Sequence, residues 1–100
     1  MVYRVVVSPR AQRDLRGVQR YISFNAPQAA LRLTQRFFSK QKILELHPEI
    51  GRMVPEIHNC AVRELIVGNY RVVYKVDHSK KEIEIVRYWH ASRGIPDVRY

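Results

Sequence analysis

Hydrophobic residues near the start of the chain recur at every third or fourth position. Between residues 9 and 24 they form one apolar stripe, made of Ala11, Leu15, Val18 and Ile22. A period near 3.6 residues is typical of an amphipathic α-helix. Ser8 supplies a capping side chain, and Pro9 suits the first helical position. The pattern therefore predicts a helix over about residues 9–24.

The next segment predicts a second helix. A break at residues 25–27 separates it from the first, and Pro48 ends it near Leu46. Its main apolar stripe contains Ala29, Ala30, Leu33, Phe37 and Leu44. Leu31 and Phe38 lie off this stripe. They either widen the core-facing side of the helix or form an exposed pair that a partner covers, and we slightly favour the partner.

The remaining periodicity is that of strands. An opening run, YRVVV, and three later runs, VRELIV, YRVVYKV and EIEIVRYWH, are rich in β-branched and aromatic residues. Gly68 and Asn69 predict a tight hairpin between the first two later runs, and a turn around Ser79 joins the last two. The link GRMVPEIHN reads as irregular and the tail GIPDVRY as surface.

This order of elements predicts an α+β fold. It consists of an N-terminal strand, a two-helix hairpin and a three-stranded antiparallel meander, with the helices packed on one face of a twisted sheet. A length of 100 residues suits one domain, so we expect residues 1–100 to fold as a unit.

The charge balance narrows the class of partner. The chain carries 18 Lys and Arg against 9 Asp and Glu, a net charge of +9. A field of this sign favours nucleic acid, an anionic membrane or an acidic protein. A hydrophobic fraction of 46% argues against disorder, and no apolar run approaches the roughly 20 residues that span a bilayer. We expect no membrane association and no signal peptide.

Cysteine and histidine usage argues against disulfides and metals. Cys60 is the single cysteine, which fits a reducing, cytosolic compartment. The four histidines, His47, His58, His78 and His90, show no ligand spacing. We expect no metal and no cofactor.

Arginines occur within or just after the predicted strands: Arg63, Arg71, Arg87 and Arg93. Alternation places Val72 and Tyr74 on one face of their strand and Arg71 mostly on the other. Arginine presents a rigid fork of donors that suits phosphate or carboxylate. The group therefore predicts a surface that meets an anion. The alternative is cross-strand pairing with the acidic residues Glu64, Glu82 or Glu84, worth about 0–1 kcal/mol for each surface pair.

A second basic row lies on the first helix. Arg10, Arg13, Arg16 and Arg20 fall roughly opposite its apolar stripe. The row is either a solvated helix face or a surface for an anionic partner, and we slightly favour the solvated face.

The succession of motifs resembles the RelE/ParE toxin superfamily of bacterial toxin–antitoxin modules. The resemblance runs through SPRAQRDLRGVQRYI, ELHPEIGRMVPE, VRELIVGNYRVVYKV and IEIVRYWHASR, which together cover nearly the whole chain. It implies a cytoplasmic bacterial toxin that an acidic antitoxin neutralises. Two targets are then open, because ParE-like members poison DNA gyrase by binding and RelE-like members are ribosome-dependent nucleases that cut mRNA.

The nuclease alternative has candidate catalysts in Glu56 as base, Arg71 as phosphate stabiliser and His90, or more weakly Tyr88, as acid. The ending RYWHASR looks more like the ParE type, and the link GRMVPEIHN lacks the lysines of many nucleases. We therefore favour a gyrase inhibitor without catalytic residues. Candidates for target or partner contact are Arg63, Arg71, Arg87, Trp89, His90 and Arg93. Candidates for antitoxin contact are Arg13, Arg20, Leu31 and Phe38.

Overall fold

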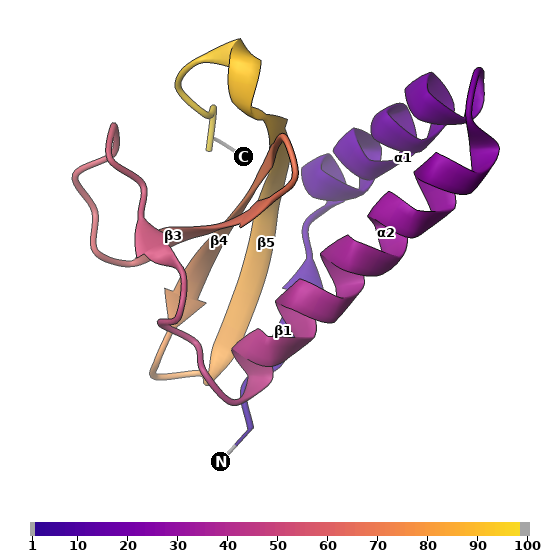
Figure 1. Ribbon diagram of the computed structural model, residues 1–100. Coiled ribbons are helices and arrows are strands. Elements are labelled where there is room, and N and C mark those ends of the chain that lie inside the picture. Colours follow the sequence, from indigo (N-terminus) through magenta and orange to yellow (C-terminus); the bar gives the residue numbers. More distant parts are fainter. Residues whose placement is uncertain (1, 99–100) are drawn as a thin grey trace.

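Two helices cover one face of a five-stranded sheet (Figure 1). The computed structural model describes residues 2–98. Its elements are β1 (Arg4–Val7), α1 (Pro9–Ser23), α2 (Pro27–Lys42), the 3₁₀ turn η1 (Ile43–Glu45), β2 (Arg52–Met53), β3 (Val62–Val67), β4 (Tyr70–Asp77), β5 (Glu82–His90) and the 3₁₀ turn η2 (Ala91–Arg93). The predicted α+β architecture and helical hairpin are confirmed.

The sheet has the strand order β1-β5-β4-β3-β2. Strands β3, β4 and β5 form the predicted antiparallel meander. Two features were not predicted. Strand β1 pairs with β5 in parallel, and the two-residue β2 pairs with the outer edge of β3. This parallel pairing places the first strand beside the last one, so β5 is an interior strand of the sheet.

Both helix starts follow local sequence signals. Ser8 caps α1, because its Oγ accepts a hydrogen bond from the amide of Ala11 at 3.1 Å. Pro27 begins α2 without a side-chain cap. The second helix ends earlier than predicted, at Lys42, and a 3₁₀ turn continues to Glu45. Tightening of the last turn in this way is common at helix ends.

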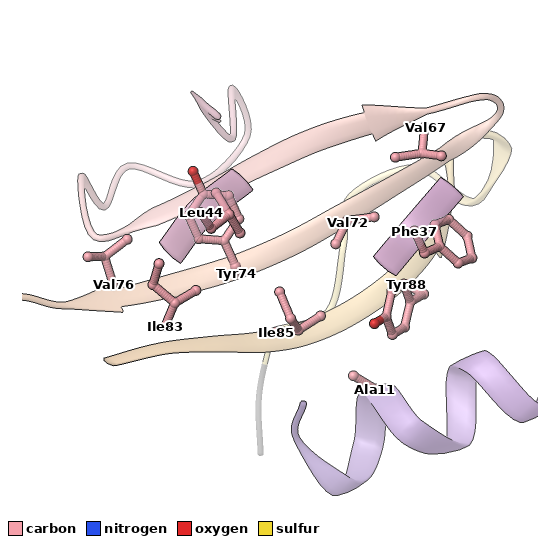
Figure 2. Close-up of a cluster of buried hydrophobic side chains, with 10 residues drawn as sticks. All are labelled: Ala11, Phe37, Leu44, Val67, Val72, Tyr74, Val76, Ile83, Ile85 and Tyr88. Carbon is pink, nitrogen blue, oxygen red and sulfur yellow. The ribbon is translucent and has the colours of Figure 1, made fainter. Parts of the chain in front are cut away.

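The main core lies between the helices and the sheet (Figure 2). Its buried members are Ala11, Phe37, Leu44, Val67, Val72, Tyr74, Val76, Ile83, Ile85 and Tyr88. The rings of Phe37 and Tyr88 lie 4.9 Å apart between centroids. The hydroxyl of Tyr88 donates to the side-chain carbonyl of Gln41 at 2.7 Å. Burial raises the pKa of Tyr88 to about 12.

A register shift in the β4–β5 ladder changes which residues of β5 face the helices. Tyr74 is opposite Ile85, yet Val73 is opposite Arg87, so the intervening Val86 has no direct partner. Before this β-bulge, Ile85 belongs to the helix-side core, and beyond it Tyr88 does. Val86 packs on the opposite face.

That opposite face has a smaller core of its own. Val54, Val62, Val73 and Val86 are buried there, with Ile57 and Val98 packed against them. The loop that follows β2 and the C-terminal segment lie on this side of the sheet (Figure 1). The tail was predicted to be surface, but Pro96 is buried and Val98 half-buried. Arg99 and Tyr100, which belong to the same predicted tail, lie outside the described residues.

The outer side of the helical hairpin exposes both apolar and basic side chains. Leu31 and Phe38 are 54% and 46% exposed, so neither widens the core. Tyr21 and Phe24 are exposed as well. Of the predicted basic row, Arg10 is half-buried and pairs with Asp97, whereas Arg13, Arg16 and Arg20 are exposed. Within residues 2–98 no helix is both long enough and apolar enough to cross a bilayer.

Candidate functional site

Arg71 lies at the centre of a buried ionic cluster on the face of the sheet opposite the helices. Its Nε donates to Glu64 at 2.5 Å. Its two terminal nitrogens donate to the two oxygens of Glu56 at 3.0 Å and 2.6 Å. These two carboxylates raise the pKa of the guanidinium, with the Glu56 hydrogen bonds contributing most. The charge of Arg71 is therefore neutralised inside the protein.

Glu64 and Glu56 differ in their surroundings. The side chain of Glu64 is fully buried and also accepts a hydrogen bond from Arg52 at 2.6 Å. Glu56 lies in the loop after β2 and keeps part of its carboxylate in solvent. The Arg71 hydrogen bonds lower the pKa of Glu56. The pairing of Arg71 with Glu64, which was the alternative to an anion-binding surface, is present, but the pair is buried and not on the surface.

Arg87 is held by the first helix. Its Nε and Nη2 donate to the two oxygens of Asp14 at 2.6 Å and 2.9 Å. Asp14 also accepts from the backbone amide of Tyr88 at 3.1 Å, at an edge of β5 that β1 does not reach. A further bond joins Arg87 to the carbonyl of Asp97 at 3.0 Å. Arg87 thus connects β5 to α1 and to the C-terminal segment.

Trp89 is 5% exposed and is contacted by two guanidiniums. Those of Arg87 and Arg93 lie 4.7 Å and 4.0 Å from its ring centroid. Its indole nitrogen donates to the carbonyl of Gly94 at 3.2 Å, which Arg71 also approaches at 3.4 Å. Arg71, Arg87, Trp89 and Arg93 are therefore brought together around the start of the C-terminal segment.

Arg63 is separate from this group. It donates to the carbonyls of Glu49 and Gly51 at 3.4 Å and 2.9 Å. Its Nε is buried without a hydrogen-bond partner among the described residues. Arg63 holds the segment between η1 and β2 against β3.

His90 lies on the helix side of the sheet, away from Arg71. The β4–β5 ladder pairs Tyr70 with His90 and Arg71 with Trp89, and successive residues of a strand point to opposite faces. The rings of His90 and Tyr70 meet edge to face at 5.0 Å. The Nδ1 atom of His90 accepts the amide of Ser92 at 3.1 Å. The structure therefore joins Glu56 to Arg71 but leaves His90 on the other face.

The sequence itself places the chain among known proteins. Residues 5–95 match the family described as the ParE toxin of the type II toxin–antitoxin system parDE. The chain belongs to the ParE toxin family. It is thus a toxin of type II toxin–antitoxin systems within the ParE/RelE superfamily. The resemblance inferred from the motifs is confirmed. No curated protein matches the chain.

Solved structures share the fold of this ParE-family chain. A chain of the chromosomal ParDE toxin–antitoxin system from P. aeruginosa has a TM-score of 0.70 at 23% identity, and the match covers 89% of this chain and 96% of that chain. The archaeal RelE–RelB complex from Pyrococcus horikoshii OT3 gives 0.63 at 24% identity, with 94% and 100% covered. The toxin–antitoxin complex RelBE2 from Mycobacterium tuberculosis gives 0.61 at 20% identity, with 90% and 99% covered.

The ParE-family chain also has a groove on the helix side of the sheet, with a volume of about 300 Å³. One flank of α1 forms one wall, and the start of β4 together with the end of β5 forms the other. The lining residues are Arg13, Asp14, Gly17, Val18, Tyr21, Tyr70, Tyr88, His90 and Arg93. Arg13, His90 and Arg93 were candidates from the sequence, but nothing there indicated that they meet.

Several residues that line the groove, among them Asp14, Gly17, Tyr21 and Tyr70, were not identified as site residues in the sequence. Asp14 is the single acidic residue of both helices, and that isolation within a basic row was an available signal. Tyr70 gave none, because its position in a strand equally suits a core residue. Among residues 2–98, no group of three or more His, Cys, Asp or Glu side chains is arranged to hold a metal ion. Cys60 is an exposed free cysteine.

Proposed function

We propose that this toxin acts by binding, that its target is DNA gyrase in the bacterial cytoplasm, and that a cognate acidic antitoxin neutralises it. One observation carries the choice of binding over mRNA cleavage. Arg71 is bound to two carboxylates, and His90 lies on the opposite face of the sheet.

Cleavage of RNA through its 2′-hydroxyl needs a base, an acid and a cation at the developing phosphorane charge. Arg71 would have to give up its bonds to Glu56 and Glu64 to supply that cation, and Glu64 has no access to solvent. Glu56 would serve as the base only weakly, because its pKa is lowered by Arg71. His90 would have to act from the other side of the sheet. The geometry supports a binding surface better than a catalytic site.

The helical hairpin supports the antitoxin part of the proposal. Arg13 and Arg20 on α1 are exposed, and α2 contains no acidic residue. The exposed Leu31 and Phe38 add apolar area on the same hairpin. An acidic amphipathic segment would match both features, with its charges steering association. Raising the salt concentration should then slow association more than it speeds dissociation in surface plasmon resonance.

The decisive test compares the two targets in parallel. Purified toxin is added to gyrase in supercoiling and DNA-cleavage assays, and primer extension maps mRNA from cells that briefly express it. We expect inhibited gyrase and intact mRNA. Codon-phased mRNA cuts with unaffected gyrase would refute the proposal.

A single variant sharpens the comparison. Of the two carboxylates beside Arg71, Glu56 is the solvent-accessible one, and Glu56→Gln replaces it with a side chain that still accepts a hydrogen bond. A binding toxin should retain its inhibition of growth in this variant. A nuclease should lose at least about 100-fold in cleavage rate.

A further inference from the structure

The groove between α1, the start of β4 and the end of β5 combines cations with aromatic rings, and the proposed function assigns no ligand to it. It lies on the helix side of the sheet, whereas Arg71 and Glu56 lie on the other face. The exposed apolar residues of α2, Leu31 and Phe38, do not line it. It is therefore distinct both from the ionic cluster and from the apolar part of the hairpin.

The charge of the groove is positive. Neither Arg13 nor Arg93 has an ion-pair partner among the described residues, and the guanidinium of Arg93 lies over the ring of Trp89. The one acid in the lining, Asp14, accepts hydrogen bonds from two nitrogens of Arg87, Nε and Nη2, and from the backbone amide of Tyr88. Two guanidiniums thus remain available at the rim, and a guanidinium fork matches phosphate oxygens.

The walls of the groove are aromatic. Tyr21 is 80% exposed at the end of α1. Tyr70 and His90 form an edge-to-face pair on the opposite wall. Burial, together with the nearby phenol of Tyr21, raises the pKa of Tyr70. The exposed ring of Tyr21 and the half-buried rings of Tyr70 and His90 thus lie in the same groove as the two cations. Aromatic rings beside cations are the combination by which proteins hold the bases of single-stranded nucleic acid.

Gly17 adds a separate observation. It lies in the middle of α1, where a glycine costs about 1 kcal/mol relative to alanine. A Cβ atom built there meets nothing within 4 Å, so packing in the free protein does not require a glycine. The residue leaves the helix backbone open toward the groove, and a flat group is able to approach it closely.

We propose that this groove binds one nucleotide unit of a single-stranded nucleic acid. The guanidiniums of Arg13 and Arg93 bind the phosphate, and the base packs over Gly17 against Tyr21. This inference goes beyond the proposed function, and it is tested without gyrase, ribosome or antitoxin.

The first test uses a fluorescein-labelled oligothymidylate of about 8 nucleotides, within the usual range of single-strand sites. Its binding to the full chain is followed by fluorescence anisotropy at several salt concentrations. Gly17→Leu should be at least as stable as the wild type in thermal unfolding and should bind about tenfold more weakly, because leucine fills the space over the helix. Tyr21→Ala should weaken binding by a similar factor.

The charge test uses two variants with the same net charge. Arg13→Gln/Arg93→Gln removes both rim cations and should lower the slope of log K against log salt by about 1.4. Arg32→Gln/Arg36→Gln removes two exposed cations from α2 and serves as the control. The control should retain clearly more affinity. Equal losses in the two variants would indicate a diffuse basic surface and would overturn the proposal.

One more outcome would overturn it, namely oligonucleotide binding that Gly17→Leu and Tyr21→Ala leave unchanged. Amide NMR with thymidine monophosphate provides an independent readout, since the Gly17 and Tyr70 signals should shift and those of α2 should not.

Discussion

Replacing Arg71 by methionine tests whether the ionic cluster supports the fold. The substitution keeps much of the apolar volume but removes the two ion pairs, one with Glu64 and one with Glu56. Glu64 is fully buried and would keep only Arg52, whose side chain is 59% exposed. Removing one partner of a buried ion pair costs about 3–5 kcal/mol, because the other charge stays desolvated. The total free energy of unfolding of a 100-residue domain is about 5–15 kcal/mol, so this cost would be a large part of it.

Urea unfolding followed by circular dichroism at neutral pH should therefore show that Arg71→Met lowers the free energy of unfolding by about 3–5 kcal/mol relative to the wild type. The melting temperature should fall by roughly 10–30 °C. The double variant Arg71→Met/Glu64→Gln should recover about 2 kcal/mol, since a neutral amide is cheaper to bury than a carboxylate. A loss below about 1 kcal/mol in the single variant, as for a surface pair, would refute the reasoning.

This result also decides how loss of toxicity in an Arg71 variant is to be interpreted. If the variant is destabilised to this extent, it loses activity because a smaller fraction of the protein is folded. Toxicity of the stabilised double variant would then separate folding from any direct role of Arg71.

Three further predictions concern single positions. Ser8→Ala should cost about 1 kcal/mol in chemical unfolding, because the cap of α1 is lost. Gly51→Ala should destabilise the protein, since its Cβ would lie 2.6 Å from the carbonyl of Glu64 and from the Tyr74 hydroxyl; an unchanged melting temperature would contradict this close approach. Burial raises the pKa of Tyr88 to about 12, so the folded state favours the neutral phenol. That contribution is present below about pH 10 and is lost as the pH rises toward 12, a step that Tyr88→Phe should remove from the pH dependence of unfolding.

The elements that rest on local pattern were predicted well. Helical spacing, the Ser8–Pro9 start and the Gly68–Asn69 turn each fix a conformation within a few residues. Strand β2 was missed because two residues carry no periodicity. The end of α2 was placed four residues late, since the apolar stripe continues through the 3₁₀ turn at Leu44.

The candidate site was predicted only as a set of residues. The arginines of the strands were identified, and the pairing of Arg71 with Glu64 was among the alternatives. The partners Glu56 and Asp14 come from a loop and a helix that are 15 and 73 positions away from the arginines they bind. No local pattern specifies contacts over such separations, because they depend on how the loop and α1 pack against the sheet.

Three properties of this protein can be read directly from its sequence: the order of helices and strands from periodicity, the basic charge from composition, and membership of the ParE toxin family from the match over residues 5–95. The face of the sheet on which each functional side chain lies depends on the complete fold. Alternation along a strand fixes relative faces, but the bulge in β5 changes that alternation between Ile85 and Tyr88. The fold also brings two carboxylates to Arg71, whereas Arg13 has no ion-pair partner among the described residues and Arg93 lies over the ring of Trp89. The physical reason is that a buried guanidinium is stable only beside carboxylates, and the fold determines which carboxylates lie beside each arginine.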